Sequence, residues 1–379
     1  MKNTKCILFY FVLFLGLNSC IEFFHPDLGE ISPKYVVDGV ITDHEGLQTV
    51  KVSTTSKLDI TKYEPLPFCK VKIMDDLGNA FDLDETLHGT YQKLIGKEYL
   101  VPGRSYKVEV VTPSGIQITS DFDQMPEGIE FDTIYYVKKD YPTSNPDKTL
   151  QGIQFYVDVD RGTHNCQYFR WDIEETWEHH AVYPLTWYLE TIDGKDILKY
   201  KFPPDWSKFF CWTTKIVKNI YTLSLENFIG TKYTMKPLHI VDNQSQRLTF
   251  GYSILVNQYS ISKPTYEYWE KHRVNSDTQG GLYSTQPITV KGNVKSTSNP
   301  DLEILGFFSA VSVSSKRFFV QNVEGLEKYE PTCPPPGKPY PYKFIYFMQG
   351  EGGLIGLYES CVECYFIEGT TAKPKFWPY

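Results

Sequence analysis

Apolar and polar residues alternate with a period of two along most of this chain, in short stretches separated by turn residues. Residues 35–41 and 49–53 alternate on either side of a turn cluster at residues 43–46, and residues 71–74 lead into another turn rich in Asp, Gly and Asn. Successive side chains of a β-strand point to opposite faces, so this pattern predicts strands with one buried face. We therefore predict an all-β fold.

The first region of this kind spans residues 34–126 and closes with a Met-Pro pair. Within it, residues 100–110 resemble the strand-entry corner of immunoglobulin-like and fibronectin-like sandwiches, in which a Tyr hydroxyl bonds back to the upstream backbone. This resemblance gives Tyr106 a structural role. We predict that residues 34–126 form an N-terminal β-sandwich domain.

A larger all-β region follows over residues 127–379. Its predicted strands are residues 132–137, 153–160, 168–178, 185–189, 216–223, 247–259 and 305–310. Trp171 shares a strand face with Phe169 and Ile173, which predicts that its indole is buried. One short helix is expected at residues 264–273, because a Pro stands in its first turn and a polar stretch ends it. The fold predicted for the whole chain is a tandem of β-sandwich domains with one short helix.

The first twenty residues follow a different pattern. Two lysines precede an uninterrupted apolar run at residues 7–17, and a small residue, Ser19, stands directly before Cys20. A membrane-spanning helix needs about 20 apolar residues, so the shorter run predicts a lipoprotein signal peptide over residues 1–19. Cys20 then becomes the lipid-bearing N-terminus, and residues 20–33 form the anchor and a short tether.

Charge and composition agree with export to the cell envelope. Cleavage before Cys20 removes two lysines and leaves 36 Lys and Arg against 46 Asp and Glu, a net charge of −10. Such an acidic chain is unsuited to nucleic acid, whose binding depends on neutralising phosphates with basic side chains. Aromatic residues make up 16% of the sequence, which favours strands over helices.

Six cysteines remain outside the signal peptide and the anchor, and export delivers them to an oxidising compartment. Four are disulfide candidates: Cys211, Cys333, Cys361 and Cys364. The last two, three residues apart, can pair with each other or divide between the other two. A redox dithiol or half a zinc site is the alternative, but no second Cys-x-x-Cys pair accompanies them. Cys69 and Cys166 are expected to be buried free thiols.

Two clusters could in principle hold a metal ion. The neighbouring His179 and His180 point to opposite faces of a strand, so they seldom share one metal. Five carboxylates crowd one hairpin region, where they could bind Ca²⁺: Asp75, Asp76, Asp82, Asp84 and Glu85. The twelve-residue calcium loop is missing there, which favours a solvated acidic face. We expect no metal and no cofactor other than the covalent lipid.

Several segments together resemble one family. In chain order they are Cys20, residues 36–43, Tyr168 to Trp171, Cys211-Trp212, Tyr268-Trp269, Gly306 to Ala310, the Cys361 and Cys364 pair, and Pro374 to Trp377. This set is similar to the Bacteroidota outer-membrane lipoproteins catalogued as domain of unknown function 4249. The resemblance implies a surface-exposed lipoprotein, acylated by palmitate-type chains, that accompanies a TonB-dependent-receptor-like barrel or a barrel of the outer-membrane assembly machinery. It implies no catalytic residue.

Aromatic residues near prolines are the remaining candidates for an interface: Tyr183, Trp187, Tyr188 and Trp206. Tyr and Trp anchor protein interfaces or stack on sugars, although these four could instead fill the sandwich core. No Gly-x-Ser-x-Gly elbow, phosphate loop or His-Glu-x-x-His motif occurs. We therefore expect a non-enzymatic subunit or binding partner of an outer-membrane barrel complex. An extracellular glycan or peptide hydrolase and a stand-alone adhesin are the alternatives.

Overall fold

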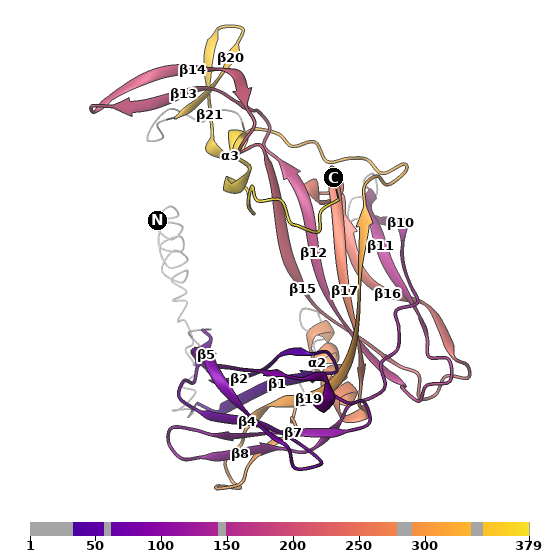
Figure 1. Cartoon of the computed structure of the whole chain (residues 1–379). Coiled ribbons are helices and arrows are strands. Elements are labelled where there is room, and N and C mark those ends of the chain that lie inside the picture. Colours follow the sequence, from indigo (N-terminus) through magenta and orange to yellow (C-terminus); the bar gives the residue numbers. More distant parts are fainter. Residues whose placement is uncertain (1–32, 57–61, 143–148, 279–289, 335–343, 379) are drawn as a thin grey trace, which may run out of the picture.

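The computed structural model describes residues 33–56, 62–142, 149–278, 290–334 and 344–378. Strands dominate this part of the chain, and the all-β prediction is confirmed. The helical elements described are α2 (Lys263–Thr278), α3 (Glu359–Val362) and the 3-10 turns η1 (Lys97–Tyr99), η2 (Gln246–Leu248) and η3 (Cys364–Phe366). Figure 1 shows three regions in a row, with a sandwich at one end, a larger β region in the middle and a small sheet at the other end.

The first sandwich contains nine strands from the N-terminal third of the chain. They are β1 (Tyr35–Thr42), β2 (Gly46–Thr54), β3 (Glu64–Pro65), β4 (Lys70–Asp75), β5 (Ala80–Leu87), β6 (Thr90–Ile95), β7 (Ser105–Val111), β8 (Gln117–Ser120) and β9 (Asp123–Gln124). Their inward side chains form one core that includes Val37 and Ile73. Tyr106 is fully buried in it. Its hydroxyl accepts the Val101 N–H and donates to the Tyr99 carbonyl, which confirms the predicted tyrosine corner.

Two strands from much later in the chain complete this sandwich. β18 (Val294–Ser296) pairs with β8, and the first half of β19 (Leu305–Val320) pairs in parallel with β1, beginning with Val36 opposite Leu305. Only glycine fits at position 306, because its φ is +102° and a Cβ there would lie 2.0 Å from the Val37 carbonyl oxygen. The first sandwich thus takes strands from residues 127–379, so the predicted division of the chain at residue 126 does not separate the two sandwiches.

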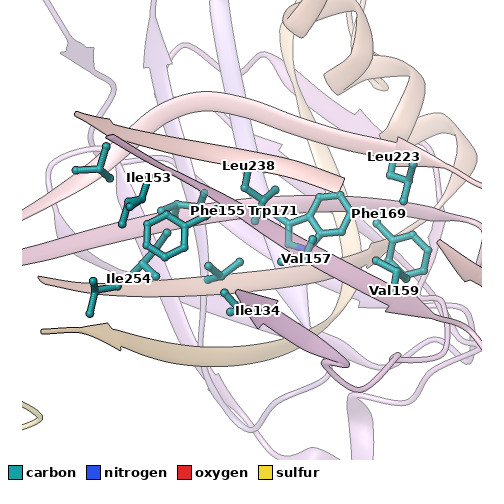
Figure 2. Close-up of a cluster of buried hydrophobic side chains, with 14 of the residues drawn as sticks. Ile134, Ile153, Phe155, Val157, Val159, Phe169, Trp171, Leu223, Leu238 and Ile254 are labelled. Atoms are coloured by element: carbon teal, nitrogen blue, oxygen red, sulfur yellow. The ribbon is translucent and has the colours of Figure 1, made fainter. Parts of the chain in front are cut away.

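The second sandwich is built from the middle of the chain. Its own strands are β10 (Thr133–Pro142), β11 (Thr149–Asp160), β12 (Tyr168–His180), β15 (Phe210–Ser224), β16 (Lys232–Asp242) and β17 (Gly251–Ile261). The second half of β19 pairs with β17, so one strand runs through both sandwiches (Figure 1). Figure 2 shows the shared core between the sheets, with Trp171 and Phe155 inside it. Trp171 is fully buried, as its strand face predicted, and its indole N–H donates to Gln258.

The junction of the two sandwiches is covered by α2, which includes the predicted helix (Figure 1). Its first turn is fixed by the buried carboxylate of Asp123 on β9. That carboxylate accepts hydrogen bonds from the hydroxyls of Ser262 and Thr265 and from the Ala310 N–H on β19. One side chain therefore ties the first sandwich, the helix and the shared strand together.

The third region is a small four-stranded sheet at the end of the molecule opposite the first sandwich (Figure 1). Its strands are β13 (Leu185–Ile192), β14 (Lys195–Asp205), β20 (Tyr346–Gly350) and β21 (Gly353–Leu357), in the order β14-β13-β20-β21. We call it the distal sheet. The chain leaves β12 to form β13 and β14 and then returns to the second sandwich as β15.

Candidate functional site: the distal sheet

The inner face of the distal sheet packs on α3. The strand register places Tyr188, Tyr346 and Leu357 next to one another on this face. With Cys361 and Val362 of α3 they form a small apolar core. The part of the inner face around Tyr188, Tyr346 and Leu357 is thereby covered.

The outer face carries several apolar residues, some of them exposed. The register puts Trp187 beside both Tyr200 and Phe347, and strand alternation brings Leu198 and Leu354 to the same side. Tyr200 is 55% exposed and Leu198 is 43% exposed. The rings of Trp187 and Tyr200 lie 4.6 Å apart. An antiparallel sheet that faces water ordinarily carries polar residues on that face, so these exposed apolar residues mark the outer face as the candidate site.

The four aromatic residues singled out from the sequence fall into two groups. Tyr183 and Tyr188 pack against the small core beneath the sheet. Trp187 lies on the outer face, and Trp206, 48% exposed, packs against neighbouring phenylalanines at the base of β14. The structure therefore brings only Trp187 onto the apolar outer face.

Sequence reasoning missed Tyr200 and the whole of β14. Leu198, Tyr200 and Phe202 alternate with two lysines, which is a strand signal, although the strand is exposed on both sides. A usable signal was present in the turn that precedes it, where Asp193 and Gly194 both have positive φ. Asp-Gly between two strand-forming runs is a strong hairpin signal.

Two disulfides hold the base of the distal sheet. Of the arrangements left open by the sequence, the structure has Cys361 bonded to Cys333 and Cys364 bonded to Cys211. The first bond joins α3 to the segment that leads toward β20, and the second joins η3 to β15. Cys69 and Cys166 are buried free thiols, as expected.

A buried carboxylate reinforces this base. Glu363, between α3 and η3, is 2% exposed and accepts hydrogen bonds from the ammonium of Lys208 and the hydroxyls of Tyr346 and Tyr365. Burial by itself raises the pKa of Glu363, but these three donors outweigh it and hold the pKa below its ordinary value. The bond to Tyr346 links the sheet directly to the helical turns beneath it.

Residues of the two clusters considered as possible metal ligands bond instead to other groups of the protein. His179 is buried and its Nε2 lies 2.9 Å from the Glu368 carbonyl oxygen, whereas His180 lies on the opposite strand face. Asp75 and Asp76 both bind the Arg104 guanidinium. Within the described ranges, no three His, Cys, Asp or Glu side chains are placed to hold a metal ion.

The predicted signal peptide and Cys20 lie outside the described residues, as does the tether up to residue 32. Most of the proline-rich stretch near residue 340 lies outside them as well. In the part of the chain that the structure covers, no helix has the length and apolar character to cross a membrane.

A family model described as Domain of unknown function (DUF4249) matches residues 21–317. The chain belongs to the DUF4249 family. The match confirms the family resemblance and extends from before β1 into β19. It covers the β13–β14 hairpin of this DUF4249 protein, whereas β20, β21 and three of the four bonded cysteines lie beyond it. No curated protein matches the chain.

Proposed function

We propose that this DUF4249 protein is a lipid-anchored, surface-exposed lipoprotein of the outer membrane that binds a β-barrel protein through the outer face of its distal sheet. The partner is a TonB-dependent-receptor-like barrel or a barrel of the outer-membrane assembly machinery, and the role is non-enzymatic. The observation that carries the proposal is the exposed apolar outer face around Trp187, Tyr200 and Leu198.

The composition of this face suits a protein partner. Binding energy in protein interfaces concentrates in a few residues, with Trp and Tyr enriched among them. Trp187 and Tyr200 supply two such side chains next to each other. The disulfides and the Glu363 hydrogen bonds fix the sheet from below, so little conformational entropy is lost when a partner docks.

The position of the face also fits this role. Cys20 precedes Tyr35, the first residue of β1 in the first sandwich, by 15 residues, so a lipid anchor there holds this sandwich near the bilayer. The distal sheet lies at the opposite end of the molecule (Figure 1). A lipid anchor at Cys20 therefore presents the outer face to a part of the barrel, or of a neighbouring domain, that projects from the membrane.

Purification of the tagged, full-length protein from detergent-solubilised outer membranes tests the proposal. We expect an outer-membrane barrel protein to be recovered in stoichiometric amount. Leu198→Glu should abolish recovery, and Trp187→Ala should weaken association by at least about 1 kcal/mol, because both change the apolar face. Ile216→Glu is the matched control, since Ile216 is 74% exposed on β15, outside the distal sheet. Recovery of the protein without a barrel, or equal losses in all three variants, would contradict the proposal.

A further inference from the structure

The distal sheet has a free edge at β14. The strand order is β14-β13-β20-β21, and among the described strands only β13 pairs with β14 (Figure 1). The unpaired N–H and C=O groups along such an edge are a template for a further strand. The edge is therefore a second binding feature of the distal sheet, beside its outer face.

The register shows which residues of β14 direct their backbone groups outward. Leu189 of β13 donates its N–H to the Ile345 carbonyl, away from β14. In an antiparallel pair, two directly opposite residues either bond to each other or both turn their backbone groups away. Leu198 lies opposite Leu189, so its N–H and C=O point to the free edge, and those of Tyr200, two residues further along, do the same. Neither residue has a backbone hydrogen bond to a further segment of the described chain.

The side chains at this edge lack neighbours in the same direction. Leu198, Tyr200 and Phe202 alternate along β14, and the rings of Tyr200 and Phe202 stack 6.5 Å apart. Trp187, one strand further in, is partly buried, whereas Tyr200 is more than half exposed and Phe202 is 79% exposed. Exposure thus rises toward the edge strand. A strand added beside β14 would cover these side chains and satisfy the outward backbone groups together.

The other side of β14 carries three lysines: Lys195, Lys199 and Lys201. If a second copy of the chain paired antiparallel through β14, centred on Leu198, Lys195 would lie opposite Lys201. Like charges directly opposite each other are destabilising, and lysines on edge strands prevent such self-association. The lysines therefore disfavour a second copy as the occupant of this edge.

The same lysines favour an acidic strand. Lys199 is paired with Glu190 and Lys201 with Asp205, but both ammonium-bearing side chains remain partly exposed. Carboxylates at alternate positions of an added strand would lie directly across from this lysine row, and opposite charges in that position stabilise a pair of strands. The occupant that fits the edge has apolar residues on one side and acidic residues on the other.

We propose that the barrel partner binds by adding one extended strand to β14, an inference that rests on the proposed function for the identity of that partner. Apolar side chains of the added strand lie over Leu198 and Tyr200, and its carboxylates lie opposite the lysines. Main-chain hydrogen bonds supply affinity in this mode of binding, and the alternating side chains supply specificity. Pro203 and Pro204 have no N–H, so the pairing stops before them.

Binding of a synthetic β-hairpin to the full mature chain, with its disulfides formed, tests the proposal. The probe is a backbone-cyclised hairpin whose outer strand reads Glu-Val-Glu-Phe-Glu-Val-Glu. We expect it to bind in fluorescence anisotropy and to slow hydrogen exchange at the amides of Leu198 and Tyr200, while Lys199, whose N–H faces β13, changes little. The same hairpin with Lys in place of Glu, or with methylated amides along the outer strand, should bind at least about tenfold more weakly.

Leu198→Pro provides the variant. It removes the outward N–H at an edge position where Pro is tolerated, and it should raise Kd at least about tenfold. Leu198→Val is the matched control, because it keeps both this N–H and an apolar side chain, so Kd should stay within about twofold. If Leu198→Pro unfolds the sheet, the methylated hairpin and the exchange pattern of the wild type decide the question.

Three results would overturn the proposal: no binding of the acidic hairpin, equal binding of the methylated one, or equal Kd for the Pro and Val variants. A dimer of the chain that Leu198→Pro dissociates would also overturn it, since the occupant would then be a second copy. Recovery of a barrel from membranes without hairpin binding would contradict strand addition alone. Hairpin binding without a recovered barrel would contradict the proposed function and support the strand site.

Discussion

Trp171 and Trp187 show how two residues of one type take different roles in this chain. Trp171 lies in the second core and its indole N–H bonds to Gln258, which is itself 1% exposed and bonded to the Ile129 carbonyl. Trp187 lies on the outer face of the distal sheet against Tyr200. The first residue contributes to folding and the second is available for binding.

Trp171→Ala should lower the free energy of unfolding by about 3–5 kcal/mol. The substitution leaves a cavity and removes the indole N–H that donates to the side-chain oxygen of Gln258. Trp187→Ala should cost less than about 1 kcal/mol, as for most partly exposed side chains. Urea denaturation of the two variants measures both values. Equal losses of stability would mean that Trp187 belongs to a core and that the interface lies elsewhere.

Asp123 predicts a dependence of stability on pH. Burial raises the pKa of its carboxyl, although bonds from Ser262, Ala310 and Thr265 oppose the change. The folded protein therefore holds this proton at a pH where the unfolded chain, titrating near about pH 4, has lost it. The contribution of Asp123 to stability is thus largest below about pH 4 and falls as the pH rises through the raised pKa.

Asp123→Asn removes this titration while an amide keeps one acceptor oxygen. Relative to the variant, the wild type should become less stable between pH 4 and pH 7, which denaturation at several pH values measures. Asp121→Asn is the control, since Asp121 is exposed and paired with Lys295. A stability difference that does not change with pH would show that Asp123 is not the titrating group.

The contacts of a single residue could be predicted from the sequence where its hydrogen-bond partners are close to it in the chain. Tyr106 bonds to atoms five and seven residues upstream, so its corner could be read from one local segment. Asp123 gave no such signal. Its partners Ser262 and Ala310 are far along the chain and meet it only after both sandwiches have formed.

At the scale of elements, the distal sheet is the part with the least core of its own. Its inner face shares a small apolar cluster with α3, and its outer face is exposed. The disulfides and the Glu363 hydrogen bonds therefore replace much of the burial that a larger element would have.

Replacing Cys333 and Cys361 together with Ser should loosen this sheet selectively. The bond closes a separation of 28 residues, for which chain entropy gives a stabilisation of about 3–4 kcal/mol. We expect faster hydrogen exchange in β13, β20 and β21, with no change in the first sandwich. Cys69→Ser, at a buried free thiol, should have no effect on the distal sheet. Unchanged exchange in the double variant would show that packing alone holds the sheet.

Most of the strands that could be predicted from the sequence have buried residues, whereas β14 and β16 were missed. The strand that contains Trp171 was visible because its inner and outer residues alternate. β14 lacks a buried face, and β16 carries Pro237, Met235 with positive φ and two breaks in register. β19 was recognised only in its first half, because nothing local shows that one strand pairs with two sheets.

At the scale of the whole molecule, the first sandwich, which begins 15 residues after the proposed anchor Cys20, and the proposed interface on the distal sheet lie at opposite ends (Figure 1). Cys20→Ala should give a protein that is no longer lipidated and no longer partitions with membranes. Fractionation followed by a carbonate wash measures this. The Leu198→Glu variant with an intact Cys20 should remain in the membrane fraction, since it changes only the interface. A Cys20→Ala protein that stays with the washed outer membrane would show that Cys20 is not the anchor.

The parallel pairing of β1 with β19 also has a mechanical consequence. If the lipid anchor and the barrel partner are as proposed, force from the anchor acts on the start of β1, whereas force from the partner acts on the second sandwich, into which β19 continues. The two strands are then drawn in opposite directions along their own axes. All seven residue pairs between them bear the load in shear, rather than opening one after another as in a peeled hairpin. A protein held at both ends in this way resists force at the joint between its two sandwiches.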